Sequence, residues 1–169
     1  MDSITIFTTA LQFEEKIRDL YREAETLIDD DRGRAIFSTL ANEEQSHIDF
    51  LENSLEILKN DGEISAEQLT TAIPDAALIA SQIDNMKTEI PERMLGDIKR
   101  ILNSALKLEE QTTAFYRDAY NQTEGNIKDV LGKFVEIEQR HTDIVQIELD
   151  HATNSGHWFN FMEISMEEG

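Results

Sequence analysis

Two short motifs in this chain have residue types and a spacing suited to binding metal ions. Each is a Glu followed three residues later by a His: Glu44 with His47, and Glu138 with His141. Residues three apart on an α-helix project from the same face, so each pair could bind one ion. Carboxylate and imidazole groups are ligands for iron, manganese and zinc. The two pairs therefore indicate a metal centre, provided that both segments are helical.

Two further glutamates, Glu14 and Glu109, stand in segments that resemble each other. The segments read LQFEEKIRDLY and LKLEEQTTAFY, so each Glu comes seven residues before a Tyr, which is Tyr21 or Tyr116. These segments lie 95 residues apart, and the two Glu-x-x-His pairs lie 94 residues apart. Similarity at nearly one offset predicts two related helical hairpins.

The apolar pattern predicts the long helices that would position these residues. Apolar side chains recur every three or four residues, and the candidate ligands stand within these apolar stripes. The short, long and short connections are typical of an all-α four-helix bundle, with two antiparallel hairpins joined by one long crossover. We expect the bundle over residues 1–153, with helices over about 3–29, 32–60, 91–121 and 125–152, a crossover over about 61–90, and a separate aromatic and acidic tail over 154–169.

Four glutamates that point into a helical bundle need compensating positive charge, because a buried carboxylate without a partner is strongly unfavourable. The Lys and Arg residues beside them in sequence fall outside the apolar stripes, whereas two divalent cations would supply the charge directly. In such a centre two glutamates bridge both ions, and the other ligands bind one ion each. The predicted bridges are Glu44 and Glu138, and the predicted single-ion ligands are Glu14, His47, Glu109 and His141.

Other residues near the motifs are expected to play outer roles. Tyr21 and Tyr116 could each donate a hydrogen bond to a ligating carboxylate. Glu15, Glu43 and Glu110 stand next to proposed ligands but fall outside the stripes. We expect these three carboxylates to be solvated.

Composition excludes several other classes of site and partner. The chain has no Cys, which excludes disulfides, thiolate nucleophiles and iron–sulfur clusters. Its formal net charge of −20 disfavours nucleic acid and anionic lipid and attracts cations. The sequence contains no apolar run of about 18 residues, the length that would predict a membrane span, and its first residues do not have the pattern of a signal peptide. We therefore expect a cytoplasmic protein without nucleic-acid or membrane partners.

The matched Glu-x6-Tyr and Glu-x-x-His segments resemble those of the ferritin-like di-iron superfamily. Within it, the chain is most similar to the rubrerythrin-type domains, also called erythrin or bacterioferritin-like domains. The resemblance implies a ferritin-like bundle with two iron ions that reduces hydrogen peroxide or dioxygen, although manganese or zinc would also suit the ligands. Without Cys there is no rubredoxin iron site in this chain, so electrons would come from Fe(II) or an external donor.

Two departures from these relatives bear on the cofactor and the activity. Thr112 stands where rubrerythrins often carry an additional Glu, which puts their redox-linked iron movement in doubt here. Gln45 replaces the haem-binding Met of bacterioferritins, so no haem is expected. Ferroxidase activity with iron storage or detoxification remains an alternative, and a substrate hydroxylase or a metal-free structural bundle is less favoured. Related bundles form homo-oligomers, among which a homodimer is favoured.

Overall fold

Within residues 2–75, 77–79 and 87–163, which the structure describes, most of the chain is α-helical. The long helices of this computed structural model are α1 (Ser3–Leu27), α2 (Asp31–Lys59), α4 (Leu95–Asn121) and α5 (Gly125–Ser155). The expected all-α ferritin-like fold is confirmed. The third predicted helix begins later than expected, because Glu92–Met94 form a 3-10 turn before α4.

The helix ends follow from residues that satisfy unpaired backbone groups. The Asp2 carboxylate accepts a hydrogen bond from the Thr5 N–H at 2.8 Å, and Asp30 accepts one from the Gly33 N–H at 2.9 Å. These bonds cap α1 and α2 at their N-termini. Helix α5 ends at Ser155, and the next residue, Gly156, has a φ of 66°, in the left-handed region that glycine adopts without strain.

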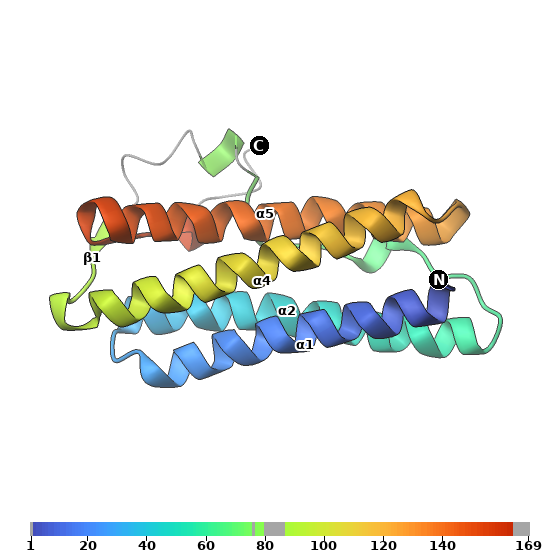
Figure 1. Ribbon diagram of the computed structural model, residues 1–169, viewed down its shortest axis with the longest axis horizontal. Coiled ribbons are helices and arrows are strands. Elements are labelled where there is room, and N and C mark those ends of the chain that lie inside the picture. Colours follow the sequence, from blue (N-terminus) through green and yellow to red (C-terminus); the bar gives the residue numbers. More distant parts are fainter. Residues whose placement is uncertain (1, 76, 80–86, 164–169) are drawn as a thin grey trace.

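The helices form two hairpins that pack side by side (Figure 1). Helix α1 packs along α2, α4 packs along α5, and the hairpins meet through α1 and α4. The connection between the hairpins passes through a 3-10 turn, Ala66–Gln68, that contacts α5. This arrangement brings the middles of the four helices together, although their sequences lie far apart.

Two apolar clusters fill the bundle, one on each side of its middle along the helices. One includes Ile17, Phe37, Leu102 and Val145, and the other includes Phe7, Leu51, Leu131 and Phe134. Residues that fall between these positions along each helix form the middle layer, which is where the candidate ligands stand. Among the described residues, no helix carries an apolar stretch of the length needed to cross a bilayer.

The aromatic tail packs on the bundle. Strand β2 (His157–Phe159) pairs antiparallel with β1 (Lys87–Glu89), with Thr88 opposite Trp158. The Trp158 side chain is fully buried, and its Nε1–H donates to Asp30 Oδ2 at 2.9 Å. Since Asp30 also caps α2, this bond ties the tail to the turn between α1 and α2.

Candidate metal centre

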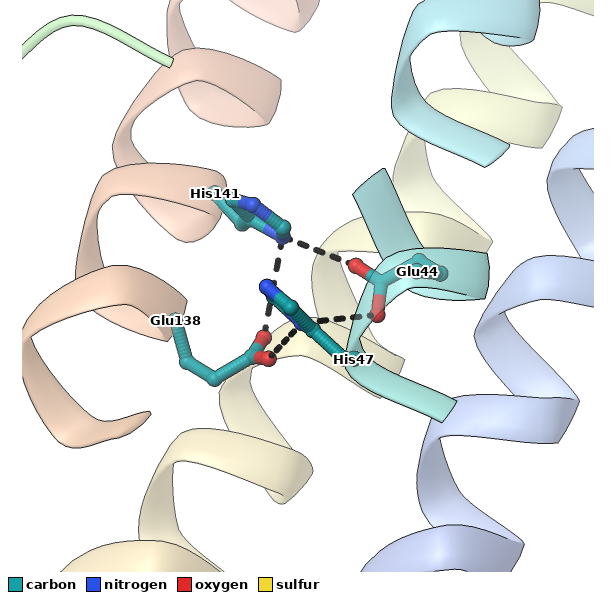
Figure 2. A group of neighbouring side chains, drawn as sticks. All are labelled: Glu44, His47, Glu138 and His141. Atoms are coloured by element: carbon teal, nitrogen blue, oxygen red, sulfur yellow. Dashed lines mark hydrogen bonds and ion pairs between the residues drawn. The ribbon is translucent and has the colours of Figure 1, made fainter. Parts of the chain in front are cut away.

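The two Glu-x-x-His pairs meet in the middle of the bundle (Figure 2). Glu44 and His47 come from α2, Glu138 and His141 come from α5, and all four side chains are fully buried. One possible ligand atom from each residue lies within 4.8 Å of the others. Figure 2 shows the four side chains pointing towards one another. Residues that are 94 positions apart in sequence thus form one cluster.

His47 and Glu14 define one side of this cluster, which we call the His47 position. His47 Nδ1 lies 3.6 Å from Glu14 Oε1. The same nitrogen lies 3.2 Å from Glu138 Oε1 and 3.7 Å from Glu44 Oε2. One imidazole nitrogen and three carboxylates therefore surround this position.

His141 and Glu109 define the opposite side, the His141 position. His141 Nδ1 lies 2.8 Å from Glu44 Oε1, and 3.8 Å from both Glu109 Oε1 and Glu138 Oε2. Glu44 and Glu138 therefore each turn one oxygen towards His47 and the other towards His141. This is the arrangement that two carboxylates need in order to lie between two metal ions.

The two tyrosines hold the outer glutamates in a crossed pattern. The Tyr21 hydroxyl donates to Glu109 Oε1 at 2.9 Å, and the Tyr116 hydroxyl donates to Glu14 Oε1 at 2.8 Å. Each tyrosine thus contacts the glutamate of the other hairpin rather than the one seven residues before it. Burial and the nearby Glu109 charge raise the pKa of Tyr21, and burial with the Glu14 charge raises the pKa of Tyr116. Both phenols therefore stay protonated and act as donors.

The buried polar atoms of the cluster are poorly satisfied by the protein. Each of the six predicted ligands has at least one buried oxygen or nitrogen without a hydrogen-bond partner among the described residues. Buried polar atoms of this kind are rare in folded proteins, because each costs free energy unless it finds a partner. The free atoms are carboxylate oxygens and imidazole nitrogens, which are suitable ligands for iron, manganese or zinc. The residues therefore fit a pair of metal ions.

Electrostatics in the cluster also favours bound cations. Burial and the charge of Glu14 raise the pKa of Glu44 and Glu138 well above the ordinary carboxyl value. Burial alone would lower the pKa of His47, but the neighbouring carboxylates, Glu14 first, outweigh it and raise that pKa. Without metal, protons thus supply the positive charge that the glutamates require. Metal ions would replace those protons.

Glu43 corrects one prediction from the sequence, because its side chain is buried rather than solvated. Only 8% of the residue is exposed, and Oε1 accepts hydrogen bonds from the Thr71 hydroxyl and, at 3.0 Å, from the Ala72 N–H. Burial raises the pKa of Glu43, but His141 and Thr71 outweigh that effect and lower it to about 2. The covering residues belong to the crossover, whose path the helical periodicity of α2 does not reveal.

The other two flanking glutamates behave differently from Glu43. Glu110 is exposed and Glu15 is partly exposed, as expected for carboxylates outside the stripes. Glu148, one heptad after His141 on α5, is fully buried outside the cluster and accepts a hydrogen bond from the Phe159 N–H at 2.7 Å. This carboxylate holds the tail rather than the metal centre.

A family model described as Rubrerythrin matches residues 5–149. The chain belongs to the rubrerythrin family. No curated protein and no solved structure gives a significant match. Rubrerythrin-family membership and the buried Glu and His residues together indicate a di-iron site. The part of each named residue in binding metal stays a prediction, although the structure brings all six predicted ligands into one buried layer and bonds both tyrosine hydroxyls to it.

Proposed function

We propose that this rubrerythrin-family chain is a di-iron oxidoreductase that reduces hydrogen peroxide or dioxygen. The observation that carries the proposal is the arrangement of Glu44 and Glu138, each with one oxygen near His47 and one near His141. Two iron ions held there would supply one electron each, and these two electrons, with two protons, are the number needed to reduce hydrogen peroxide to two molecules of water.

The side chains of the bundle would hold the ions and keep them apart from solvent. Glu14 with His47, and Glu109 with His141, would each bind one ion, and Glu44 and Glu138 would bind both. All six side chains are fully buried between two apolar clusters. A dry layer of this kind strengthens the attraction between carboxylate and cation.

The tyrosine hydroxyls would fix the direction of the outer carboxylates. Each hydroxyl donates a hydrogen bond to Oε1 of the glutamate that it contacts, Glu109 or Glu14. The other oxygen of both glutamates, Oε2, has no hydrogen-bond partner among the described residues. That free oxygen is available for an ion. The nearby Thr112 hydroxyl donates to the Leu108 carbonyl at 2.7 Å, so this side chain is held against its own helix. The proposal therefore assigns one fixed set of six ligands.

Electrons would reach the centre from Fe(II) or from an external donor protein, because the chain has no Cys for an iron site of its own outside the bundle. We propose that the protein works in the cytoplasm and as a homo-oligomer, with a dimer favoured. Manganese is the other metal that the ligand set would accept for redox chemistry.

Anaerobic Fe(II) titration followed by peroxide addition tests the proposal. We expect two iron ions per chain, rapid oxidation of both by hydrogen peroxide, and repeated turnover when a reductant is supplied. Metal analysis after expression in iron-supplemented medium should give the same ratio. Protein that takes up no stoichiometric metal, or that binds two iron ions without reacting with either oxidant, would contradict the proposal.

Iron storage or detoxification by the same centre is the second candidate, favoured by the net charge of −20. An acidic surface attracts Fe(II) and could guide it towards a ferroxidase site. The assembly separates the two candidates. A large particle that accumulates mineral iron beyond two ions per chain would support storage, whereas a small oligomer with sustained peroxide turnover would support the reductase.

A further inference from the structure

His141 and His47 differ in what lies behind the imidazole ring. Both rings turn Nδ1 towards the shared carboxylates, and the rings stack at 5.2 Å with an interplanar angle of 12°. The outer nitrogen of His141, Nε2, makes no hydrogen bond among the described residues, but it lies 3.5 Å from Glu43 Oε1, within ion-pair distance. The outer nitrogen of His47 also makes no hydrogen bond, has no carboxylate at that distance among the described residues, and belongs to a ring that packs perpendicular to Phe134.

The internal repeat accounts for this difference. Glu43 immediately precedes Glu44, and the matching residue before Glu138 is Ile137, which is buried in an apolar cluster. The motif Glu-x-x-His is therefore present twice, but the carboxylate before it is present once.

Residues of the crossover hold the Glu43 side chain in place. Its Oε1 accepts hydrogen bonds from the Thr71 hydroxyl and the Ala72 N–H, and the Ile73 N–H donates to Thr71 Oγ1 at 3.1 Å. The Ile73 carbonyl in turn accepts a hydrogen bond from Arg140, the neighbour of His141 on α5, at 3.1 Å. Residues 71–73 thus connect α2 to α5 directly over the contact between Glu43 and His141.

A carboxylate behind a ligating imidazole has a known physical effect. When Nδ1 binds a metal ion, Nε2 carries the proton and can donate it to an acceptor. An acceptor at this position fixes the ring orientation and makes the imidazole a stronger ligand, and its loss typically costs about 10- to 100-fold in metal affinity. Among the described residues, the Glu43 carboxylate, 3.5 Å from His141 Nε2, is the acceptor placed to serve in this way.

We propose that Glu43 is a positioning residue that makes the two metal positions unequal, by orienting His141 and tightening the His141 position relative to the His47 position. The inference rests on the proposed two-metal centre and adds an order of filling to it. The first ion enters the His141 position, and the second enters the His47 position.

Cobalt(II) titration of the metal-free protein tests the order of filling. The wild type should bind two ions in two resolved steps. Glu43→Ala should weaken one step by about 10- to 100-fold and leave the other within about twofold. Glu43→Gln keeps an oxygen acceptor but not the charge, so it should recover part of the loss. The matched control is Glu110→Gln, which makes the same charge change at an exposed residue beside Glu109 and should alter neither step.

Variants that lack one outer ligand show which of the two metal positions Glu43→Ala affects. Glu14→Gln removes a ligand predicted only for the His47 position, and Glu109→Gln removes one predicted only for the His141 position. Adding Glu43→Ala should weaken the cobalt(II) binding that remains in Glu14→Gln protein and leave the binding that remains in Glu109→Gln protein unchanged. Equal effects in the two backgrounds would overturn the proposal.

Imidazole NMR of the zinc-loaded protein supplies a readout that general loss of structure would not produce. The chain has four histidines, which makes assignment practical. In the wild type, His141 should be protonated on Nε2, and that proton should exchange slowly with water. Glu43→Ala should speed the exchange of this proton without changing the His47 signals. An unchanged His141 proton would overturn the proposal.

Thr71→Val provides a second test of the role of Glu43 if Glu43→Ala does not fold. This variant removes the hydroxyl donor to Glu43 with little change in shape, and we expect a several-fold weakening of the same cobalt(II) step. No change in either step would overturn the role of residues 71–73 and Glu43. A wild type that binds no cobalt(II) would overturn the proposed function together with this inference, whereas two ions bound without any effect of Glu43 would overturn the inference alone.

Discussion

The two helical hairpins carry the same ligand motifs, yet their surroundings differ. In the cluster itself the halves are nearly equivalent, because Glu44 and Glu138 each face both histidines and each tyrosine holds the opposite outer glutamate. Outside the cluster the equivalence ends. The crossover covers one side of the site through Glu43, and the repeat places Ile137 at the matching residue.

A second pair of matching residues, one heptad after each histidine of the cluster, also differs. Glu148 is fully buried and accepts a hydrogen bond from the tail, whereas the residue 94 positions earlier is Ser54, a small buried side chain. Repetition of a metal motif therefore does not repeat the packing around it. The segments that are not repeated, namely the crossover and the tail, make the two halves different.

Replacing the proposed bridging glutamates should have the largest effect on metal affinity, and the effect should be equal at the two metal positions. Glu44→Gln and Glu138→Gln each remove one charge that both metal positions share, so we expect affinity for both ions to fall more than about 100-fold. Metal analysis and Fe(II) titration measure the loss. The metal-free variants should be at least as stable as the wild type in urea, because a buried carboxylate has been removed. Loss of only one ion would contradict the bridging role.

Replacing the outer glutamates should separate the halves. Glu14→Gln should abolish binding at the His47 position, and Glu109→Gln should abolish it at the His141 position, so each variant should keep close to one ion per chain. Cobalt(II) titration with absorbance detection gives the stoichiometry. If both variants lost both ions, the division into two positions with separate outer ligands would be wrong.

The tyrosines should show an effect that crosses from one hairpin to the other. Tyr21→Phe removes the hydroxyl that donates to Glu109, so it should weaken the His141 position by roughly tenfold, and Tyr116→Phe should do the same at the His47 position. The control is a double variant. In Glu109→Gln protein, adding Tyr21→Phe should have little further effect on metal binding, and an undiminished effect would argue against the crossed contact.

Glu148→Gln should change stability but not metal binding, with an effect on the order of 1 kcal/mol. Burial raises the pKa of Glu148 well above 4.5, so the folded protein holds a proton that the unfolded chain has lost. Stability from this group is thus fully present below about pH 4.5, and falls by up to about 1.4 kcal/mol per unit as pH rises towards the folded pKa.

Urea unfolding of the metal-free protein between pH 5 and pH 8 tests this expectation. The glutamine can still accept the bond from Phe159 but does not titrate, so the stability of the variant should fall less steeply with pH than that of the wild type. Glu110→Gln serves as the exposed control and should follow the wild type. Parallel curves for Glu148→Gln and wild type would mean that Glu148 is not held protonated by the fold.

Much of this structure could be predicted from local patterns. Helical periodicity located the four helices, because an amphipathic helix must turn its apolar face to the core. The glutamates and histidines within those faces indicated a buried cluster, which the structure contains. The family was also recognisable, since the motifs repeat at matched offsets and the family model covers the same helices.

What the sequence could not supply was contact between segments without periodicity. Glu43 looks like a solvated carboxylate because it lies outside the stripe of α2, and it becomes buried when residues 71 and 72 pass over it. The crossed bonds of Tyr21 and Tyr116 depend in the same way on how α1 lies against α4.

The sequence by itself determined that this protein is a four-helix bundle with six candidate ligands in its middle layer. A residue's position along a helix fixes which face it occupies, and that face fixes whether it turns inward. Only the tertiary structure decided which atoms meet across the layer and that Glu43 stands behind His141. Those contacts depend on the packing of separate segments, and packing is set by the whole chain rather than by any local pattern.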